Sequence, residues 1–166
     1  MAYEQCVSNF ENSPWRDRLF CYHASFQEFV DEIDDKYDLI VSNPPFYTNP
    51  HKSSNSQRDL SRFEDALPFE HLIYGASKLL EQNGKFVLII PFSEEQNFIK
   101  SALEVSLFPS KILRVKGTPK SEIKRSLIEL SFDTIEVDIS ELIIETNRHQ
   151  YTTDYIELTN EFYIRM

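Results

Sequence analysis

Residues 39–47, Leu-Ile-Val-Ser-Asn-Pro-Pro-Phe-Tyr, contain the side chains best suited to chemistry in this sequence. Asn43 follows an apolar run directly, and two prolines come after it. Each proline fixes its own φ, and Pro45 also keeps Pro44 out of the α region. Such a stiff turn can present the amide oxygen of Asn43 and the carbonyl oxygen of Pro44 side by side. Two fixed acceptors match the two hydrogens of an amino group.

Phe46 adds an aromatic ring that can stack on the flat group carrying this amine. The two acceptors would direct the nitrogen lone pair toward an electrophile and stabilise the positive charge that develops on it. A nucleobase must leave its stack to enter such a site, and stacking contributes roughly 1–3 kcal/mol per base. The alternative, a simple strand end with Phe46 in the core, fits Asn-Pro alone better than the whole Asn-Pro-Pro-Phe motif. The motif therefore indicates chemistry on an exocyclic amino group or a side-chain amide.

Short apolar runs on both sides of this motif predict β-strands. Residues 38–42 and 85–90 are continuous apolar runs, which is typical of strands buried on both faces. Further strand-prone runs are Leu19–Tyr22, Ile112–Val115, Ser126–Ser131 and Leu142–Ile144. Ile112–Val115 and Ser126–Ser131 enclose a basic loop, which suggests an antiparallel pair at one edge of the sheet.

Helical patterns alternate with these strands. The predicted helices cover residues 2–12, 26–30, 68–82, 93–106 and a C-terminal stretch capped at Thr153-Asp154. Asn83-Gly84 is a typical C-cap, and Ser93 with Gln96 resembles a capping box. The alternation predicts a single α/β domain with a mostly parallel sheet. Ligands of such sheets bind beyond the carboxyl ends of the strands, where Asn43, Pro91 and the long polar loop 43–66 are expected.

The charge of the chain is uneven. The net charge is −10, which argues against a general phosphate-binding surface. Residues 111–125 nevertheless carry six basic side chains against one acid, so this stretch is +5 and the remainder is −15. The stretch is either a solvated surface segment or a basic lip for an anionic substrate.

Other function classes find little support. The four histidines share no metal-ligand spacing with Cys6 and Cys21, and no serine lies in a Gly-x-Ser-x-Gly motif. No window has the apolar length of a membrane span, and the N-terminus has no export signal. We therefore expect free thiols, no metal and a cytoplasmic protein.

Four stretches carry a resemblance to a known family. Residues 38–46, DLIVSNPPF, resemble motif IV of S-adenosylmethionine-dependent amino-methyltransferases. Three more are similar to bacterial tRNA1(Val) (adenine-N6)-methyltransferases and extend the match from Tyr3 to Tyr163: NF with SPWRDRL near the N-terminus, KGTPKSEIKR at 116–125, and YTTDY with LT and FY at the C-terminus.

This resemblance implies a class I methyltransferase fold, S-adenosylmethionine as cofactor, and N6-methylation of the adenine just 3′ of a tRNA anticodon. By position in the motif, Asn43, Pro44, Pro45 and Phe46 would hold and stack the target adenine. Ser25 and Phe26, together with Asn43, would contact the cofactor, although the family often has an acid where Ser25 stands. The residues that would approach RNA are Arg62, Lys116, Lys120, Lys124 and Arg125.

The family's glycine-rich cofactor turn has no counterpart here, because Gly75, Gly84 and Gly117 form no GxG. The resemblance thus implies that residues 1–166 are one N-terminally truncated methyltransferase domain, with strands 3 to 7 of the Rossmann-like sheet. Leu19–Tyr22 would then lack a neighbouring strand. Residues 38–42 would expose an apolar edge through which the chain could self-associate. We expect the isolated chain to bind the cofactor weakly or not at all.

Two alternatives remain open from the sequence. The same motif serves enzymes that methylate a release-factor glutamine or an rRNA guanine, and the acidic charge favours a protein substrate. The chain could also be a non-catalytic module that binds RNA or protein through its basic stretch.

Overall fold

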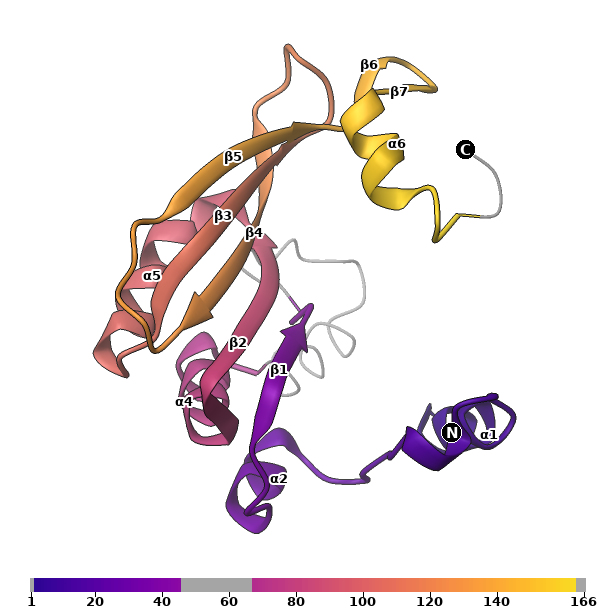
Figure 1. Cartoon of the computed structure of the whole chain (residues 1–166), viewed down its shortest axis with the longest axis vertical. Coiled ribbons are helices and arrows are strands. Elements are labelled where there is room, and N and C mark those ends of the chain that lie inside the picture. The colour runs from indigo at the N-terminus through magenta and orange to yellow at the C-terminus, as the bar shows by residue number, and fades with distance from the viewer. Residues whose placement is uncertain (1, 46–66, 164–166) are drawn as a thin grey trace, which may run out of the picture. The chain divides into compact units, whose positions relative to one another are not determined.

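The computed structural model describes residues 2–45 and 67–163, which form two units, Met1–Asp35 and Lys36–Met166. Figure 1 shows the elements of both units. Within the described part of the chain, no helix has the length and apolar character needed to cross a membrane.

The first unit consists of α1 (Ala2–Glu11), a 3₁₀ turn η1 (Arg16–Arg18) and α2 (Phe26–Glu32). These helices confirm the two helical patterns predicted near the N-terminus. A capping box begins α2: Oγ of Ser25 accepts from the Glu28 amide at 3.2 Å, and the Ser25 amide donates to Oε2 of Glu28 at 2.8 Å. Every described residue of this unit is at least partly exposed, so the unit has no hydrophobic core of its own.

The strand predicted at Leu19–Tyr22 is wrong. This segment follows η1 without regular structure, and Phe20 and Tyr22 are exposed. A β-strand is stable only where a neighbouring strand satisfies its backbone N–H and C=O groups. The described residues of the first unit include no other strand, so the local β-propensity of this segment is left without a partner.

The second unit is built on a five-stranded sheet in the order β1-β2-β4-β3-β5. Strand β1 pairs in parallel with β2, strand β4 is antiparallel to both β2 and β3, and β3 is parallel to β5. This arrangement confirms the α/β class and the antiparallel pair, and β5 adds to the outer side of that pair (Figure 1). The strands are β1 (Tyr37–Ser42), β2 (Leu80–Pro91), β3 (Phe108–Lys116), β4 (Ile123–Ser131) and β5 (Asp138–Ile143).

Helices α4 (Phe69–Leu79) and α5 (Glu95–Glu104) pack on one face of this sheet (Figure 1). Alternate residues of β2, namely Phe86, Leu88 and Ile90, point to this face and are almost fully buried. Phe98 of α5 packs edge-on against Phe69 of α4, with ring centroids 5.1 Å apart. The remaining core residues from the two helices and β4 are Leu72, Ile73, Ala76, Leu79, Ala102, Ile128 and Leu130.

The C-cap predicted at Asn83-Gly84 is wrong. Helix α4 ends at Leu79, and β2 begins directly at Leu80, so Gly84 lies inside a strand. A Cβ atom on Gly84 would lie only 2.8 Å from the carbonyl oxygen of Tyr37 and 2.9 Å from the Leu80 side chain. Glycine is therefore required here by the close approach of β1 to β2, and not by the end of a helix.

The capping box predicted at Ser93 is also wrong. The chain leaves β2 through a 3₁₀ turn, η2 (Phe92–Glu94), so Ser93 lies inside a helical turn instead of preceding one. Glu94 occupies the N-cap position of α5 without a side-chain cap, and Oγ of Ser93 contacts Oε1 of Glu94 at 3.4 Å.

Strand β1 is not buried on both faces, contrary to the expectation from its apolar run. Leu39 is 56% exposed and Val41 is 71% exposed, because both point away from the face that α4 and α5 cover. Strand β1 is also the first strand in the sheet order, so the expected apolar edge is present in the described structure.

The C-terminal segment folds against the hairpin formed by β3 and β4. It contains the short ribbon β6 (Glu145–Asn147) and β7 (Gln150–Tyr151), followed by α6 (Thr153–Thr159). Thr152 caps α6, accepting from the Tyr155 amide at 3.2 Å, and its hydroxyl donates to the carbonyl of Ile143. The amides of Ile144 and Glu145 donate to the carbonyls of Lys116 and Gly117, so this segment is bonded to the hairpin where β3 enters the turn.

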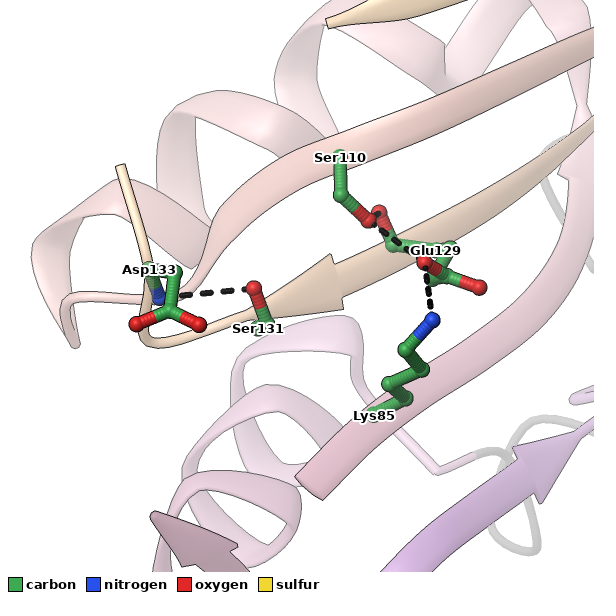
Figure 2. Close-up of polar contacts among 5 residues, drawn as sticks. All are labelled: Lys85, Ser110, Glu129, Ser131 and Asp133. Atoms are coloured by element: carbon green, nitrogen blue, oxygen red, sulfur yellow. Dashed lines mark hydrogen bonds and ion pairs between the residues drawn. The ribbon is translucent and has the colours of Figure 1, made fainter. Parts of the chain in front are cut away.

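Figure 2 shows a polar cluster near the start of β3 and the end of β4, beside the middle of β2. Oε1 of Glu129 accepts from Nζ of Lys85 at 3.0 Å and from Oγ of Ser110 at 2.8 Å. Burial works against the charged form of Glu129, but the Lys85 and Ser110 contacts outweigh it, so its pKa is lowered. This cluster joins β2, β3 and β4 at the end of the sheet opposite to Asn43.

Candidate functional site

The sheet topology brings three sequence features to one edge. Strands β1 and β2 are parallel, with Ser42 opposite Leu88, so Asn43 leaves the sheet at the same end as Pro91. Strand β3 also runs in this direction, because β4 is antiparallel to both β2 and β3. The β3–β4 turn therefore lies at this end as well (Figure 1). We call this end of the sheet the carboxyl edge, and it is where the sequence predicts ligand binding.

The Asn-Pro-Pro turn begins the segment that follows β1. Asn43 and Pro45 are exposed, whereas Pro44 between them is buried. The buried proline anchors the turn, and its fixed φ restricts the positions that the neighbouring amide can take. Phe46, the predicted stacking ring, and Arg62, a predicted RNA contact, lie outside the described residues.

Ser25 and Phe26, the predicted cofactor contacts, belong to the first unit. Ser25 is the N-cap of α2, and its hydroxyl and amide both bond to Glu28. Phe26 is the first residue of that helix and is half-buried. Their contact with a cofactor remains a prediction.

The basic hairpin is less positive than its sequence suggests. Nζ of Lys116 lies 2.8 Å from Oε2 of Glu141 on β5, so this lysine is paired within the sheet. Lys124 lies 3.9 Å from Glu122, and both side chains are well exposed, so this pair is weak. Lys120, Lys124 and Arg125 are exposed at the carboxyl edge.

Hydrogen bonds define the backbone of the turn at the tip of the hairpin, which contains Lys120. The Thr118 amide donates to Oγ of Ser121 at 2.9 Å, and the Ser121 hydroxyl and amide donate back to the Thr118 carbonyl at 2.9 and 3.0 Å. Such reciprocal bonds define the backbone of a short loop. The tip is therefore an ordered platform for Lys120.

A buried ionic cluster lies directly below the carboxyl edge. Glu95, which is only 4% exposed, accepts two hydrogen bonds from Arg114: from Nε at 3.2 Å and from Nη2 at 2.7 Å. The hydroxyl of Ser126, which is fully buried, donates to Oε2 of the same carboxylate. The cluster joins the start of α5 to β3 and β4.

These contacts keep Glu95 ionised. Burial disfavours the charged carboxylate, but the hydrogen bonds from Arg114 and Ser126 and the charge of Arg114 outweigh this effect, so the pKa of Glu95 is lowered. This cluster was not identified from the sequence, because Arg114 was counted only among the six basic side chains of residues 111–125. The alternating pattern of β3 places Arg114 on the same face as buried Ile112, which is the one signal that could have revealed it.

Arg114 also contacts the first residue beyond β2. Its Cζ atom lies 5.5 Å from the centroid of the Phe92 ring, within the range of a cation–π contact. Phe92 is 37% exposed and follows Pro91 directly. The carboxyl edge thus presents an amide, a ring resting on a guanidinium, and a basic tip.

The described part of the chain contains no group of three His, Cys, Asp or Glu side chains that could hold a metal ion. Cys6 and Cys21 are free thiols, as expected.

Comparisons with solved structures and with curated proteins found similar proteins. The chain shares its fold with a solved protein of similar topology. A crystal structure of a predicted O-methyltransferase from Agrobacterium tumefaciens matches 85% of this chain with a TM-score of 0.59 at 18% sequence identity, and this chain covers 58% of it. No family model matches the chain.

Curated relatives cover nearly the whole chain. Proteins named tRNA1(Val) (adenine(37)-N6)-methyltransferase are 57% identical in Flavobacterium johnsoniae, 56% in Christiangramia forsetii and 37% in Bacteroides fragilis. Each match includes 99% of this chain, which spans 71%, 70% and 70% of these relatives. The chain belongs to the tRNA1(Val) (adenine(37)-N6)-methyltransferase family.

Proposed function

We propose that this chain serves the N6-methylation of an adenine in the anticodon loop of tRNA, with S-adenosylmethionine as methyl donor. The name of its relatives specifies adenine 37 of tRNA1(Val). The observation that carries the proposal is the Asn43-Pro44-Pro45 turn at the carboxyl edge, where an α/β sheet binds its ligands.

The chain's own residues would hold and orient the substrate amine. S-adenosylmethionine supplies an electrophilic methyl group when it is bound. The amide oxygen of Asn43 and the carbonyl oxygen of Pro44 would accept the two hydrogens of the adenine amino group, which leaves its lone pair free for attack. Both oxygens also stabilise the positive charge that the nitrogen develops. Phe46 would stack on the base and keep it in this plane.

The glycines of the chain do not provide a cradle for the methionine part of the cofactor. Gly75 lies inside α4, Gly84 lies inside β2, and Gly117 begins the hairpin turn. None of them forms the turn from a strand into a helix at which backbone amides would approach the donor. We therefore propose that the 166-residue chain alone binds S-adenosylmethionine weakly or not at all. Micromolar binding in a calorimetric titration of this chain would contradict this point.

The exposed cations of the hairpin favour RNA over a protein substrate. Lys120, Lys124 and Arg125 stand at the same edge as Asn43, where they could contact phosphates on either side of the target base. We also propose that the activity lies in the cytoplasm, which the tRNA-modifying names of its relatives support.

The proposal is tested by methyl transfer from labelled S-adenosylmethionine with the full-length gene product. We expect tRNA to be labelled, and release factor and ribosomal RNA to remain unlabelled. Asn43→Ala should lower the turnover rate by about 100- to 1,000-fold, the usual effect of losing one preorganised polar contact to the reacting group. Its affinity for tRNA should change less than about twofold, because phosphate contacts dominate that affinity.

Asn83→Ala provides a matched control, because Asn83 is an exposed asparagine at the opposite end of β2. This variant should keep full activity. Label in release factor instead of tRNA, or an Asn43→Ala variant as active as the control, would overturn the proposal.

A further inference from the structure

Phe92 occupies a distinctive place at the carboxyl edge. It follows Pro91, where β2 ends, and the parallel pairing of β1 with β2 brings the start of the Asn-Pro-Pro turn to the same edge. Phe92 is 37% exposed, although two other phenylalanines of the second unit, Phe86 on β2 and Phe98 on α5, are almost fully buried. Its chain position therefore leaves an aromatic surface open where the substrate is expected.

One side of this ring rests on Arg114. The guanidinium carbon lies 5.5 Å from the ring centroid, and the guanidinium is fixed from behind by its two bonds to Glu95. The carboxylate is fixed in turn by the hydroxyl of Ser126. Residues of three elements, α5, β3 and β4, thus form the bonded cluster that holds the Arg114 guanidinium beside the Phe92 ring.

An ion pair with a buried carboxylate is a costly way to stabilise a protein, because the buried charge must lose its hydration. The Glu95 side chain is 5% exposed, whereas that of Arg114 keeps 31% of its exposure. What the pair does provide is a single geometry, since the planar guanidinium fork matches a carboxylate in one orientation. The effect of the Glu95–Arg114 pair at this edge is therefore to orient the Phe92 ring that lies against the guanidinium.

We infer that Phe92 is a nucleobase-stacking residue of the tRNA site, and that Glu95 and Ser126 are positioning residues that act on it through Arg114. This inference rests on the proposed function. Sequence-specific RNA recognition uses unstacked loop bases that lie on aromatic side chains. The target adenine is assigned to Phe46, so Phe92 would receive a base that adjoins the target. The guanidinium beside the ring adds a positive charge for the phosphate of that nucleotide.

The inference is tested with a stem-loop RNA of the tRNA1(Val) anticodon arm. 2-Aminopurine, whose fluorescence is quenched by stacking, replaces in turn the base on each side of the target adenine. Titration with the 166-residue chain should quench one of the two labels. Phe92→Leu should abolish this quenching and weaken binding by roughly 5- to 20-fold, the lower range of the loss of one base–aromatic stack.

Two further variants control for a general effect of removing a ring. Phe92→Tyr keeps the stacking surface and should behave as the unmodified chain. Phe162→Leu removes a phenylalanine that is 84% exposed near the C-terminus and should change neither binding nor quenching.

A double variant separates positioning from folding. Glu95→Gln combined with Arg114→Met replaces both charges by neutral side chains of similar size, so the melting temperature should stay close to that of the unmodified chain. The quenching should nevertheless fall by at least half, because the ring has lost its support. Arg114→Lys keeps a cation but not the two-bonded fork, and should give an intermediate loss.

The outcomes distinguish this inference from the proposed function. If the unmodified chain binds the RNA but quenches neither label, or does not bind it, the stacking inference is overturned, and the methyl-transfer assay decides the proposed function separately. If Phe92→Leu quenches the same label as fully as the unmodified chain does, the stacking role is wrong while the proposed function stands. If Phe92→Leu abolishes the quenching but the double variant keeps it in full, Phe92 stacks without help from Glu95 and Arg114, and the positioning role is wrong.

Discussion

Glu95 and Arg114 form a two-bonded ion pair across the end of the sheet, although they are 19 residues apart in the chain and lie on different elements. Glu95 opens α5, and Arg114 lies near the end of β3. The pair connects the helix layer to the root of the basic hairpin. The arrangement of the carboxyl edge therefore depends on a contact between two elements and not on any one loop.

The first prediction concerns pH. The pKa of Glu95 is lowered in the folded chain, so its stabilising contribution is present above the unfolded value of 4.5 and is lost as the pH falls through the lower folded value. Glu95→Gln removes this contribution and should lower the free energy of unfolding at neutral pH by about 1–3 kcal/mol. The loss should shrink as the pH falls below 4.5 and through the lower folded pKa, because protonation removes the same charge from the unmodified chain.

Urea titrations at a series of pH values measure this effect. Glu129 also has a lowered pKa, so the free energy of unfolding of the Glu95→Gln variant should still depend on pH to some extent. Glu81→Gln changes an exposed glutamate near the start of β2 and serves as the control. An equal loss of stability at neutral and acidic pH would show that the Glu95 carboxylate acts through packing alone.

The second prediction concerns Gly84. Gly84→Ala places a methyl group 2.8 Å from the backbone carbonyl of Tyr37, which cannot move without disturbing the pairing of β1 with β2. We expect a loss of about 1–3 kcal/mol in the free energy of unfolding, which is typical of an overpacked site. Gly117→Ala is a matched control, because the nearest atom, Oγ of Ser121, would lie at 3.7 Å. Equal stability of the two variants in thermal melts would contradict this account.

Local patterns predicted most of the sheet and the substrate motif. The apolar runs within β1 to β4 are contiguous, and so are the residues of the Asn43-Pro44-Pro45 turn, so each could be recognised without knowing its partners. The alternation of strands and helices predicts the α/β class and that Asn43 and Pro91 share one edge, but it did not predict that β5 lies outside the antiparallel pair.

Features that depend on distant partners were predicted poorly. Gly84 has the sequence context of a helix C-cap, but the approach of Tyr37 from another strand is the reason for glycine. Leu19–Tyr22 has β-propensity without a strand to pair with in its unit. Lys116 was counted as an RNA contact, yet a carboxylate on β5 lies 2.8 Å from it. In each case a tertiary contact overrides the local preference.

The third prediction separates the cations of the hairpin. Lys120→Gln and Lys124→Gln should each reduce the salt dependence of tRNA binding, lowering the slope of log K against log salt by about 0.7–0.9 if each side chain neutralises one phosphate. Lys116→Gln should change this slope less, because Lys116 already pairs with Glu141. Filter binding at several salt concentrations measures the slopes. Three equal slopes would mean that the Lys116–Glu141 pair opens when RNA binds.

The last prediction concerns the apolar face and edge of β1. Leu39 and Val41 are 56% and 71% exposed on a strand that ends the described sheet order, an arrangement that favours edge-to-edge pairing of chains. Val41→Lys places a charge on this face without removing a core contact, so it should reduce self-association with a change in stability below about 0.5 kcal/mol. Ile40→Lys, on the opposite and less exposed face, should destabilise the chain instead. Light scattering and thermal melts distinguish the two effects. Undiminished self-association of Val41→Lys would show that the chains associate through a surface other than β1.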